Sequence, residues 1–458
     1  MDTIIRYESF IDGKKHLSND FGIDIKFVPD MMFDYQKEIT EYATKKGRCA
    51  VFLDTGLGKT LIELTIAQNY ASHTGKPVLL VAPLAVAFQF VKEAERFGID
   101  DVSYSKDGSI DSKIVVCNYD RLDKFDSRKF DCVILDESSI LKNFDGAIKA
   151  SVTAFMRNVK YRYLFTATPS PNDFVELGTS SEALGYMGYT DMLTKYFTNN
   201  EDTIKPQNIG TQWVLKGHAV DAFFEWVSSW SISMRRPSDL GYSDEKHQLP
   251  ALHLNHHVIA NQENMVVSGQ IMLINSIARR LTEVREENKL TIGPRCEKAY
   301  DLARHHDVSV YWCNLNQEGD MLQQMDKGAQ QIKGSMHIDE KEDLLINFFR
   351  GDIKRLITKP KMTAFGLNWQ HCNHTTFFPT FSYEQYYQAI RRFWRFGQQR
   401  EVTVDLVYSD GQKRVIDSLL AKAEKSSELF EKLNGKLNAS YTDSKKQFDK
   451  NVSLPKFI

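Results

Sequence analysis

The chain has 458 residues, 42% of them hydrophobic, and this length exceeds the size at which one core keeps growing, so two or three domains are expected. Its 58 Lys and Arg nearly balance 60 Asp and Glu, and the formal charge of −2 argues against a blanket-basic protein that coats nucleic acid. Six scattered cysteines and the lack of an apolar run near ~18 residues argue against a disulfide framework and a membrane helix, and favour a soluble cytoplasmic protein.

Short apolar runs alternate with helical-period segments through about residue 170. The runs occupy residues 49–53, 78–81, 114–116, 132–135 and 163–165. They are continuous rather than alternating, which is typical of strands that are covered on both faces. They therefore predict a parallel sheet flanked by helices.

A region rich in aromatic residues follows, from about residue 171 to 250. We interpret about 171–235 as a mostly helical insertion in the first α/β unit. Residues 236–245 have the Pro, Gly and Ser content of a connector, so the link between two units is expected there.

A second set of strand-like runs lies at residues 308–312, 356–357, 376–378 and 402–407, after a segment of helical pattern at 261–306. The fold class expected is α/β, with a first unit at 1–245, a second at 246–440 and a polar tail at 441–458. The histidines at 253, 256, 257, 371 and 374 lack a second cluster that would complete a metal site. A surface or the junction between the units is expected for the first three, and a strand edge or a buried loop for the other two.

A glycine-rich loop follows the first strand-like run. It reads Asp54-Thr55-Gly56-Leu57-Gly58-Lys59-Thr60 and leads into a helical pattern. In this context backbone N–H groups and the helix N-terminus hold phosphates, Lys59 bridges the β- and γ-phosphates, and Thr60 ligates Mg²⁺. Leu53 stands where the strict pattern has its first glycine, so the match is to Gly-x-Gly-Lys-Thr in its context. We expect residues 55–60 to bind ATP.

An acidic pair, Asp136-Glu137, follows the run at 132–135. Alone, such a pair is often an ordinary turn. Together with the upstream loop it has the form of a Walker B site, in which Asp136 holds Mg²⁺ through water and Glu137 orients and deprotonates the attacking water.

The ordered motifs resemble those of superfamily 2 helicases and translocases, most closely the chromatin-remodeller-like branch. The resemblance covers most of the chain and implies two RecA-like lobes, each a mostly parallel sheet flanked by helices. Phe33-Asp34-Tyr35-Gln36 resembles the family's adenine-reading element, with Gln36 on the adenine edge. Val81-Ala82-Pro83-Leu84 and Val116-Cys117-Asn118-Tyr119 resemble its nucleic-acid segments, with Pro83, Leu84, Asn118 and Tyr119 as the expected contacts.

Two more first-lobe segments resemble the family. Asp136-Glu137-Ser138-Ser139 resembles its acidic box, although Ser138-Ser139 stand where Ala-Asp, Ala-His or Gly-His are usual. This departure leaves the magnesium and water chemistry in place. Thr166-Ala167-Thr168-Pro169 resembles the coupling motif, which implies that Thr166 and Thr168 link hydrolysis to lobe movement.

The second unit carries two further motifs. Residues 358–369 resemble the fifth motif, which implies that Thr358, Lys359 and Lys361 meet nucleic-acid phosphates and that Gly366 approaches the nucleotide. Gln388-Ala389-Ile390-Arg391-Arg392-Phe393-Trp394-Arg395-Phe396-Gly397-Gln398 resembles the sixth motif, Gln-Ala-x-x-Arg-x-x-Arg-x-Gly-Gln.

Arg392 and Arg395 lie three apart, which predicts one face of a helix from which both reach a γ-phosphate on the facing lobe. The guanidinium group suits this task because it is always charged and binds phosphate in a bidentate manner. Gln388 is expected to belong to the same catalytic set, whereas Arg391 stands where the branch often has Asp.

The resemblance implies a nucleic-acid-stimulated ATPase that uses ATP and Mg²⁺ and moves along DNA, with duplex or branched DNA preferred over RNA. Two alternatives stay open, an ATP-gated clamp on nucleic acid or a partner protein, and an RNA helicase. The motif wording also resembles helicase-type proteins of bacteriophages, which implies work in a bacterial cytoplasm. We expect no membrane partner and a monomer, and no residue pattern specifies a protein partner, a polarity or a pathway.

Overall fold

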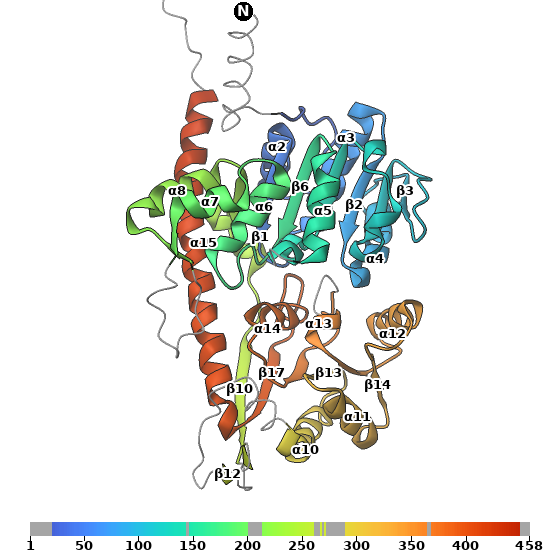
Figure 1. The fold of residues 1–458 in the computed structure, drawn as a ribbon. Coiled ribbons are helices and arrows are strands. Elements are labelled where there is room, and N and C mark those ends of the chain that lie inside the picture. Colours follow the sequence, from blue (N-terminus) through green and yellow to red (C-terminus); the bar gives the residue numbers. More distant parts are fainter. Residues whose placement is uncertain are drawn as a thin grey trace, which may run out of the picture. The chain divides into compact units, whose positions relative to one another are not determined.

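The computed structural model describes residues 21–142, 146–199, 213–260, 266–267, 270–271, 289–363 and 368–448. Contacts divide the chain into two units, Met1–Lys246 together with Ser426–Ile458, and His247–Lys425. Each unit is built on a parallel sheet with flanking helices (Figure 1), as the sequence predicts. Within the described ranges, no helix is both long enough and apolar enough to cross a membrane.

The sheet of the first unit has seven parallel strands in the order β3-β4-β2-β5-β6-β1-β9. The strands are β1 (Arg48–Leu53), β2 (Val78–Ala82), β3 (Val102–Tyr104), β4 (Ile114–Asn118), β5 (Cys132–Leu135), β6 (Tyr161–Thr166) and β9 (Ser231–Met234). Helices α2 (Asp34–Lys46), α3 (Lys59–Thr74) and α4 (Leu84–Arg96) share one core cluster with it. Helices α5 (Ala147–Arg157), α6 (Leu177–Leu184), α7 (Tyr189–Tyr196) and α8 (Val220–Ser228) share the other.

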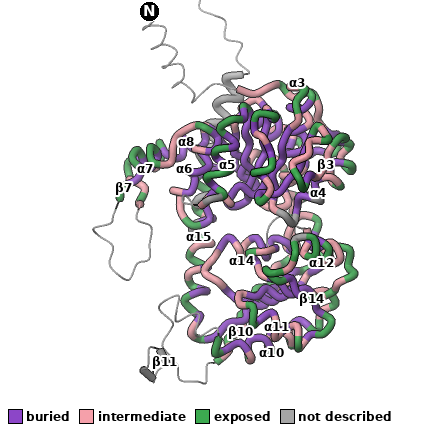
Figure 2. Tube along the Cα trace, turned by 45° about the vertical axis from the view of Figure 1, so that its right-hand side comes forward, coloured by how far each residue is buried: buried purple, intermediate pink, exposed green. Residues whose placement is uncertain are grey.

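Both faces of this sheet are buried, which explains why its strands read as continuous apolar runs. Along β1, Ala50 and Phe52 pack into one core cluster, and Cys49, Val51 and Leu53 pack into the other. Figure 2 shows the same pattern, with purple buried segments through the centre of the unit and exposed residues on the outer helices and loops.

The aromatic region after residue 171 is part of this core. The ring centroids of Trp226 and Trp230 lie 5.5 Å apart, and those of Phe223 and Trp226 lie 5.8 Å apart. The prediction of an insertion is only partly right, because β9 lies inside the region and pairs in parallel with β1, while β7 (Phe197–Asn199) and β8 (Trp213–Leu215) form a small antiparallel pair. The sequence hides β9 because Ser231 and Ser233, both fully buried, interrupt its apolar run.

The sheet of the second unit has six parallel strands in the order β10-β17-β16-β13-β15-β14. The strands are β10 (Leu252–Ile259), β13 (Ser309–Trp312), β14 (Ala329–Gln331), β15 (Arg355–Thr358), β16 (His374–Phe377) and β17 (Val402–Ser409). The helices are α10 (Ile292–Ala303), α11 (Asn316–Met325), α12 (Ile338–Arg350), α13 (Pro360–Thr363) and α14 (Tyr383–Ile390).

The helical expectation for residues 261–306 is right only for its last part. Helix α10 lies there, but β11 (Val266–Val267) and β12 (Gln270–Ile271) form an antiparallel pair instead of helix. Residues 261–265, 268–269 and 272–288 lie outside the described residues.

The C-terminal helix α15 (Lys413–Phe448) corrects the expected domain limits. Residues from Ser426 onward group with the first unit, where Phe430 and Leu433 are buried in the core beside α8. Ser233 Oγ donates to Asn434 Oδ1 at 2.7 Å, and Asn434 Nδ2 donates to Asp239 Oδ2 at 2.8 Å. The second lobe therefore ends before the expected residue 440, and the expected polar tail is helical as far as Phe448.

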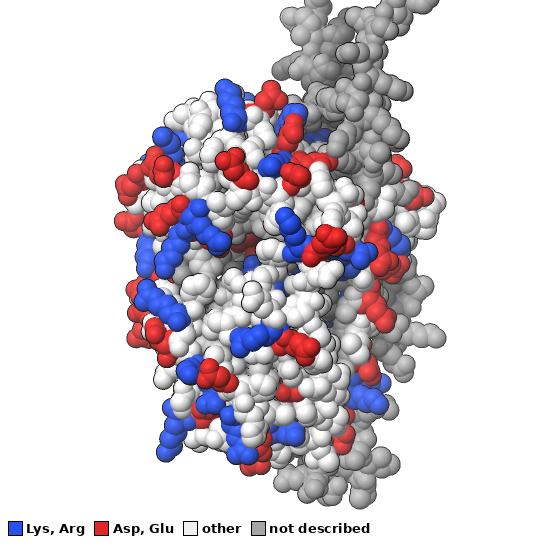
Figure 3. All heavy atoms as spheres, turned by 180° about the vertical axis from the view of Figure 1, so that it is seen from behind, with Lys and Arg blue, Asp and Glu red and all other residues white. Residues whose placement is uncertain are grey.

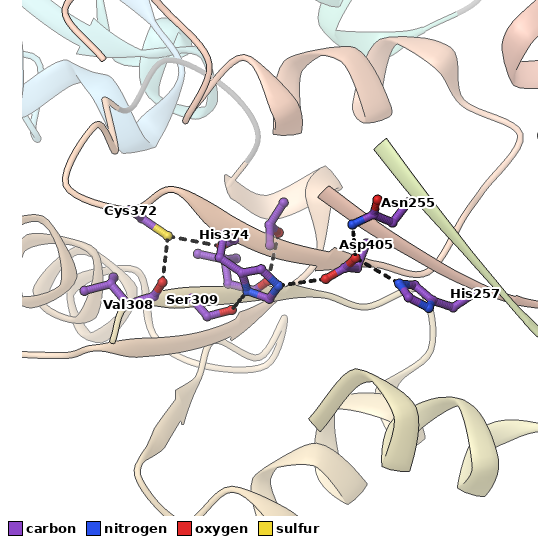
Figure 4. Close-up of polar contacts among 9 residues, drawn as sticks. Asn255, His257, Val308, Ser309, Cys372, His374 and Asp405 are labelled. Carbon is purple, nitrogen blue, oxygen red and sulfur yellow. Dashed lines mark hydrogen bonds and ion pairs between the residues drawn. The ribbon is translucent and has the colours of Figure 1, made fainter. Parts of the chain in front are cut away.

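A polar network ties together four strands of the second sheet (Figure 4). The carboxylate of Asp405 accepts hydrogen bonds of 2.9 Å from His374 Nε2, His257 Nε2 and Asn255 Nδ2. On its other side, His374 Nδ1 lies 2.8 Å from Ser309 Oγ. These contacts give His257 and His374 structural partners, and they lie on the strands themselves.

His306, which stacks on His374 of this network, makes the stability of the second unit depend on pH. The ring of His306 stacks on that of His374 with centroids 3.7 Å apart, and burial, followed by the neighbouring His374, lowers the pKa of His306 to about 4. An unfolded histidine has a pKa near ~6.5, so between about pH 6.5 and pH 4 the unfolded chain binds more protons than the folded chain. The second unit is therefore expected to lose stability as the pH falls through this window.

His306→Phe keeps an aromatic ring at this position and removes the titration, so this variant should lose less stability between pH 7.5 and pH 5 than the unmodified protein. The measurement is the urea concentration at which β13 and β16 lose protection from amide hydrogen exchange. His305→Phe changes the exposed neighbouring histidine and serves as the control. Equal losses in His306→Phe and the unmodified protein would refute the assignment.

Candidate nucleotide and nucleic-acid sites

The residues predicted to act in the first unit meet at one edge of its sheet. The loop at 54–58 follows β1, Pro83 follows β2, Asn118 ends β4, Asp136 follows β5 and Thr166 ends β6. These strands are parallel neighbours, so their carboxyl ends lie at a common edge, where open α/β sheets bind ligands. The order of the strands thus brings together segments that lie far apart in the sequence.

The glycine-rich loop has the conformation that its sequence requires. Gly56 and Gly58 have φ angles of +86° and +83°, which only glycine adopts without strain. A Cβ atom at Gly58 would lie 2.2 Å from Gln36 Nε2, so a larger residue there would displace the side chain of Gln36. Lys59, the first residue of α3, donates from Nζ to the carbonyl oxygen of Leu53 at 3.0 Å.

The side chain of Gln36 is hydrogen-bonded to the glycine-rich loop. Its Nε2 donates to the carbonyl oxygen of Leu57 at 2.9 Å, and its Oε1 accepts from the backbone N–H of Phe33 at 2.9 Å. The side chain is 5% exposed. Gln36 therefore holds the nucleotide loop in its conformation, and its hydrogen bond to adenine stays a prediction.

The acidic pair is buried and its backbone is strained. Asp136 and Glu137 are each 6% exposed, and Glu137 has a φ of +51°, a left-handed conformation that a glutamate adopts only when its surroundings impose it. The hydroxyl of Tyr119 donates to the carbonyl oxygen of Asp136 at 2.6 Å. Tyr119 follows β4, which lies two places from β5 in the sheet. The bond therefore ties the strained turn after β5 to the segment after β4.

The coupling segment contacts the same pair. Thr166 Oγ1 donates to Glu137 Oε2 at 3.5 Å, and the backbone N–H of Thr168 donates to Thr166 Oγ1 at 3.0 Å. Both threonines are buried. The Glu137 carboxylate is thus connected to the backbone after β6 by two successive hydrogen bonds through Thr166 Oγ1.

Glu63 on α3 is a third carboxyl group at this site that the sequence reasoning missed. It is fully buried, and its pKa is raised well above the usual value by burial and then by the charge of Asp136. Burial and then Glu137 also raise the pKa of Asp136 to about 7, against the opposing effect of Lys59. An acidic residue between Ile62 and Leu64 in an apolar helix was the available signal.

The donor set fits a hard cation. Mg²⁺ prefers oxygen ligands and is usually bound through one or two carboxylates together with substrate phosphates. Buried carboxyl groups with raised pKa values are those that gain most from a nearby positive charge. Thr60, in the first turn of α3, and Asp136 are the residues that would hold Mg²⁺ here.

The predicted nucleic-acid segments of the first unit place their side chains differently from the expectation. Asn118 is 1% exposed and Tyr119 is 8% exposed, so both side chains are buried in this structure, and their contact with nucleic acid stays a prediction. Pro83 is half-buried and precedes α4, whose first residue is Leu84. Backbone contacts of these segments with nucleic acid stay predictions.

The sixth-motif arginines do not lie on a helix, which corrects the prediction. Helix α14 contains Gln388 but ends at Ile390, and Arg392 and Arg395 lie in the tight turns that follow it. In these turns Phe393 is fully buried and Trp394 is partly buried, and the N–H groups of both bond to the carbonyl oxygen of Ile390. Arg392 is 2% exposed and lies 5.5 Å from the ring centroid of Trp369.

A cavity of about 170 Å³ lies at the carboxyl edge of the second sheet. Thr358 and Lys359 of the fifth motif line it, whereas Lys361 is exposed on α13 and is not among its lining residues, and Gly366 lies outside the described residues. The sequence reasoning missed its other polar walls, Asn316, Asp320, Gln331, Lys333 and Ser335. Lys333 Nζ lies 2.8 Å from Asp320 Oδ1, so a phosphate that binds Lys333 has to compete with this carboxylate. Lysine next to Gly334 and Ser335 after a strand was the available signal.

Charges are mixed on the face shown in Figure 3, where Lys and Arg side chains alternate with Asp and Glu. This distribution agrees with the near-neutral composition of the chain. Basic side chains that could meet a phosphate backbone are therefore local, as at the cavity with Lys333 and Lys359.

Known proteins match parts of this chain in sequence. Residues 30–171 match the family model described as "Type III restriction enzyme, res subunit". The SWI/SNF-related matrix-associated actin-dependent regulator of chromatin subfamily A-like protein 1 of Xenopus tropicalis is 28% identical over 173 residues, 35% of this chain and 18% of that protein. The DNA annealing helicase and endonuclease ZRANB3 of Mus musculus is 27% identical over 190 residues, 37% of this chain and 18% of that protein.

One solved structure resembles nearly the whole chain. The structure of S. cerevisiae Dbp5 bound to RNA and ADP BeF3 has a TM-score of 0.52 and 13% identity, and the match covers 87% of this chain and 93% of that one. This likeness is one of fold, and it identifies the two units as RecA-like lobes. The curated relatives are about five times longer than the segment that matches them, which covers 18% of each.

Proposed function

We propose that the protein is a DNA translocase of the chromatin-remodeller-like branch of superfamily 2, which couples hydrolysis of ATP to movement along DNA. The substrates of the reaction are ATP and water, and the cofactor is Mg²⁺. Because its motif sequences resemble those of bacteriophage helicase-type proteins, we also propose that the protein is of bacteriophage type and acts in a bacterial cytoplasm.

One observation carries this proposal beyond nucleotide binding. The hydrolytic pair is held by hydrogen bonds from two other segments, Tyr119 to the Asp136 carbonyl and Thr166 to the Glu137 carboxylate. Tyr119 follows β4, and Thr166 is the last residue of β6. An enzyme that only binds or hydrolyses ATP needs neither hydrogen bond. A motor needs them, because ATP binding and hydrolysis have to change the conformation of the segments that bind DNA.

The residues of the first lobe then have distinct tasks. Residues 55–58 and the N-terminus of α3 bind the phosphates, and Lys59 leaves the Leu53 carbonyl to bridge the β- and γ-phosphates. When bound through Thr60 and Asp136, Mg²⁺ neutralises phosphate charge. Glu137 orients the attacking water and accepts its proton, because its carboxylate is buried and aimed by the strained turn.

The second lobe supplies positive charge. We propose that Arg392 and Arg395 act on the γ-phosphate of the ATP that the first lobe binds, and that Gln388 supports them. Catalysis then requires both lobes, so that each hydrolysis event is coupled to a change in how the lobes grip DNA.

DNA is favoured over RNA because part of the sequence is similar to proteins whose names specify chromatin and DNA annealing. ATPase rates with single-stranded DNA, duplex DNA, forked DNA and RNA test this directly. Stimulation by duplex or forked DNA is expected, and stimulation by RNA alone would overturn the DNA assignment. Movement without processive unwinding is the expected mode.

The second candidate is an ATP-gated clamp that holds nucleic acid or a partner protein and uses hydrolysis only for release. The same nucleotide site serves both activities. They differ in net displacement along DNA, because a clamp retains DNA in the presence of ATP but does not travel.

The cavity of the second lobe gives a further prediction. Lys333→Ala and Lys359→Ala should each raise the DNA concentration for half-maximal ATPase stimulation by roughly fivefold, because each change removes a phosphate contact and the counterion release that goes with it. The slope of log affinity against log salt concentration should also fall by roughly one for each lysine removed.

The control is Lys354→Ala. Lys354 precedes β15, at the other end of the strand from Thr358, and its Nζ lies 2.9 Å from Asp307. A salt slope that is unchanged in Lys333→Ala and Lys359→Ala would place DNA elsewhere on the lobe.

A further inference from the structure

Arg295 and Glu318 form a fully buried ion pair in the second lobe. Arg295 Nη1 lies 2.7 Å from Glu318 Oε1, and both side chains are 0% exposed. Arg295 comes from the first turn of α10, where its Nε also donates to Thr291 Oγ1 at 3.0 Å. Burial of two charges is costly and is often no better for stability than an apolar pair of similar size, so stability alone does not account for these residues.

Glu318 of this pair is hydrogen-bonded to a loop at the carboxyl edge of the second sheet. The second oxygen of Glu318, Oε2, accepts hydrogen bonds of 2.8 Å from the backbone N–H groups of Asn314 and Leu315. These residues connect the end of β13 to the start of α11. The carboxylate thus binds the loop with one oxygen and the guanidinium group with the other, and Arg295 fixes its orientation.

The loop held in this way is a wall of the lobe-2 cavity. Cys313, Leu315 and Asn316 line the cavity together with Lys333 and Lys359. The N–H of Cys313 also donates to the carbonyl oxygen of Thr358 at 2.8 Å, which ties the loop to the segment that carries Lys359. Arg295 and Glu318 therefore fix the conformation of a loop that lines the same cavity as Lys333 and Lys359.

We propose that Arg295 and Glu318 are positioning residues for DNA binding by the second lobe. They hold residues 313–316 in the conformation that shapes the cavity for a phosphate backbone, and they do not contact the DNA. This inference rests on the proposed function, because it assigns the ligand of the cavity as DNA.

The test uses the double variant Arg295→Met/Glu318→Leu in the full chain. Both charges are removed together, so that no unpaired charge is left in the core. Its control is Arg304→Met/Asp301→Leu, which removes an exposed ion pair of 3.4 Å from the same helix region without touching the loop. Should the double variant not fold, Glu318→Gln retains the shape of the side chain and weakens the same contacts.

Two quantities are measured, amide hydrogen exchange of the peptide that covers residues 313–316 and the duplex DNA concentration for half-maximal ATPase stimulation. Exchange should be faster in the double variant, and the DNA concentration should rise about tenfold, as expected when a binding group is misplaced. The KM for ATP and the ATPase rate without DNA should stay at the values of the unmodified protein, and the control variant should behave as the unmodified protein in both measurements.

Unchanged exchange would show that the pair does not hold the loop and would overturn the inference. Faster exchange with an unchanged DNA requirement would also overturn it, because the loop would then not shape the DNA site. Lack of ATPase stimulation by any DNA in the unmodified protein is a different result, since it would overturn the proposed function as well as the ligand assigned to the cavity.

Discussion

Arg395→Ala is expected to lower the DNA-stimulated ATPase rate by about 10³-fold or more, which is the contribution that an arginine at a transferring phosphate makes in related reactions. Arg395 is half-buried in the turn after α14 and comes from the lobe that lacks the phosphate loop. Its loss should leave the binding of ATP to the first lobe nearly intact, because residues 55–60 supply the main phosphate contacts. The measurement compares steady-state hydrolysis with the affinity for a fluorescent ATP analogue.

Arg414→Ala is the matched control, since Arg414 is an exposed arginine of α15 within the same unit. It should hydrolyse ATP at the unmodified rate. Arg392→Ala should also lose hydrolysis, but Arg392 is almost fully buried against Trp369, so part of its effect is on stability. Full activity of Arg395→Ala would remove the second lobe from the catalytic step.

Glu137→Gln is expected to lower the hydrolysis rate by about 10³-fold, because the amide cannot accept the proton of the attacking water. The substitution preserves the shape of the side chain and the neighbouring hydroxyl of Thr166, so the strained turn at φ +51° should persist. It leaves Thr60 and Asp136, the residues that would hold Mg²⁺, unchanged. The variant should therefore bind ATP and fail to turn it over.

Single-turnover hydrolysis and nucleotide affinity test this expectation together. Glu95→Gln, a change of the same kind at an exposed position of α4, is the control. A Glu137→Gln variant that turns over at the unmodified rate would exclude Glu137 as the base, and Glu63 would be the next carboxylate to examine because it is buried at the same site.

The sequence predicted the first lobe well because its signals are local. The runs at β1, β2, β4, β5 and β6 are continuous, since Ala50 and Phe52 face one core cluster while Val51 and Leu53 face the other. The glycine loop was predictable because Gly58 has no substitute beside Gln36. A parallel sheet then places the ends of these strands together without further information.

The segments that the sequence hid depend on contacts made far along the chain. Strand β10 is rich in histidine and largely exposed, and only its parallel pairing with β17 makes it a strand. Strand β9 pairs with β1 although Ser231 and Ser233 break its apolar pattern. Both belong to edges of their sheets, where one neighbouring strand suffices.

Site details failed for a similar reason. The spacing of Arg392 and Arg395 suggested a helix, but the packing of Phe393 ends α14 at Ile390. Tyr119 resembles a nucleic-acid contact in sequence, yet its hydroxyl is directed to the carbonyl of Asp136. The polar C-terminal segment gave little sign that Phe430 and Leu433 enter the core of the first lobe. The roles that the motifs assign to these residues stay predictions.

The central claim is movement along DNA, and displacement of a third strand from a triplex on duplex DNA tests it most directly. The protein is expected to release the third strand only with hydrolysable ATP and Mg²⁺, at a time that grows with the distance between its entry point and the triplex. Glu137→Gln and Arg395→Ala should release none. DNA-stimulated ATP hydrolysis by the unmodified protein without any release of the third strand would contradict the account and favour the ATP-gated clamp.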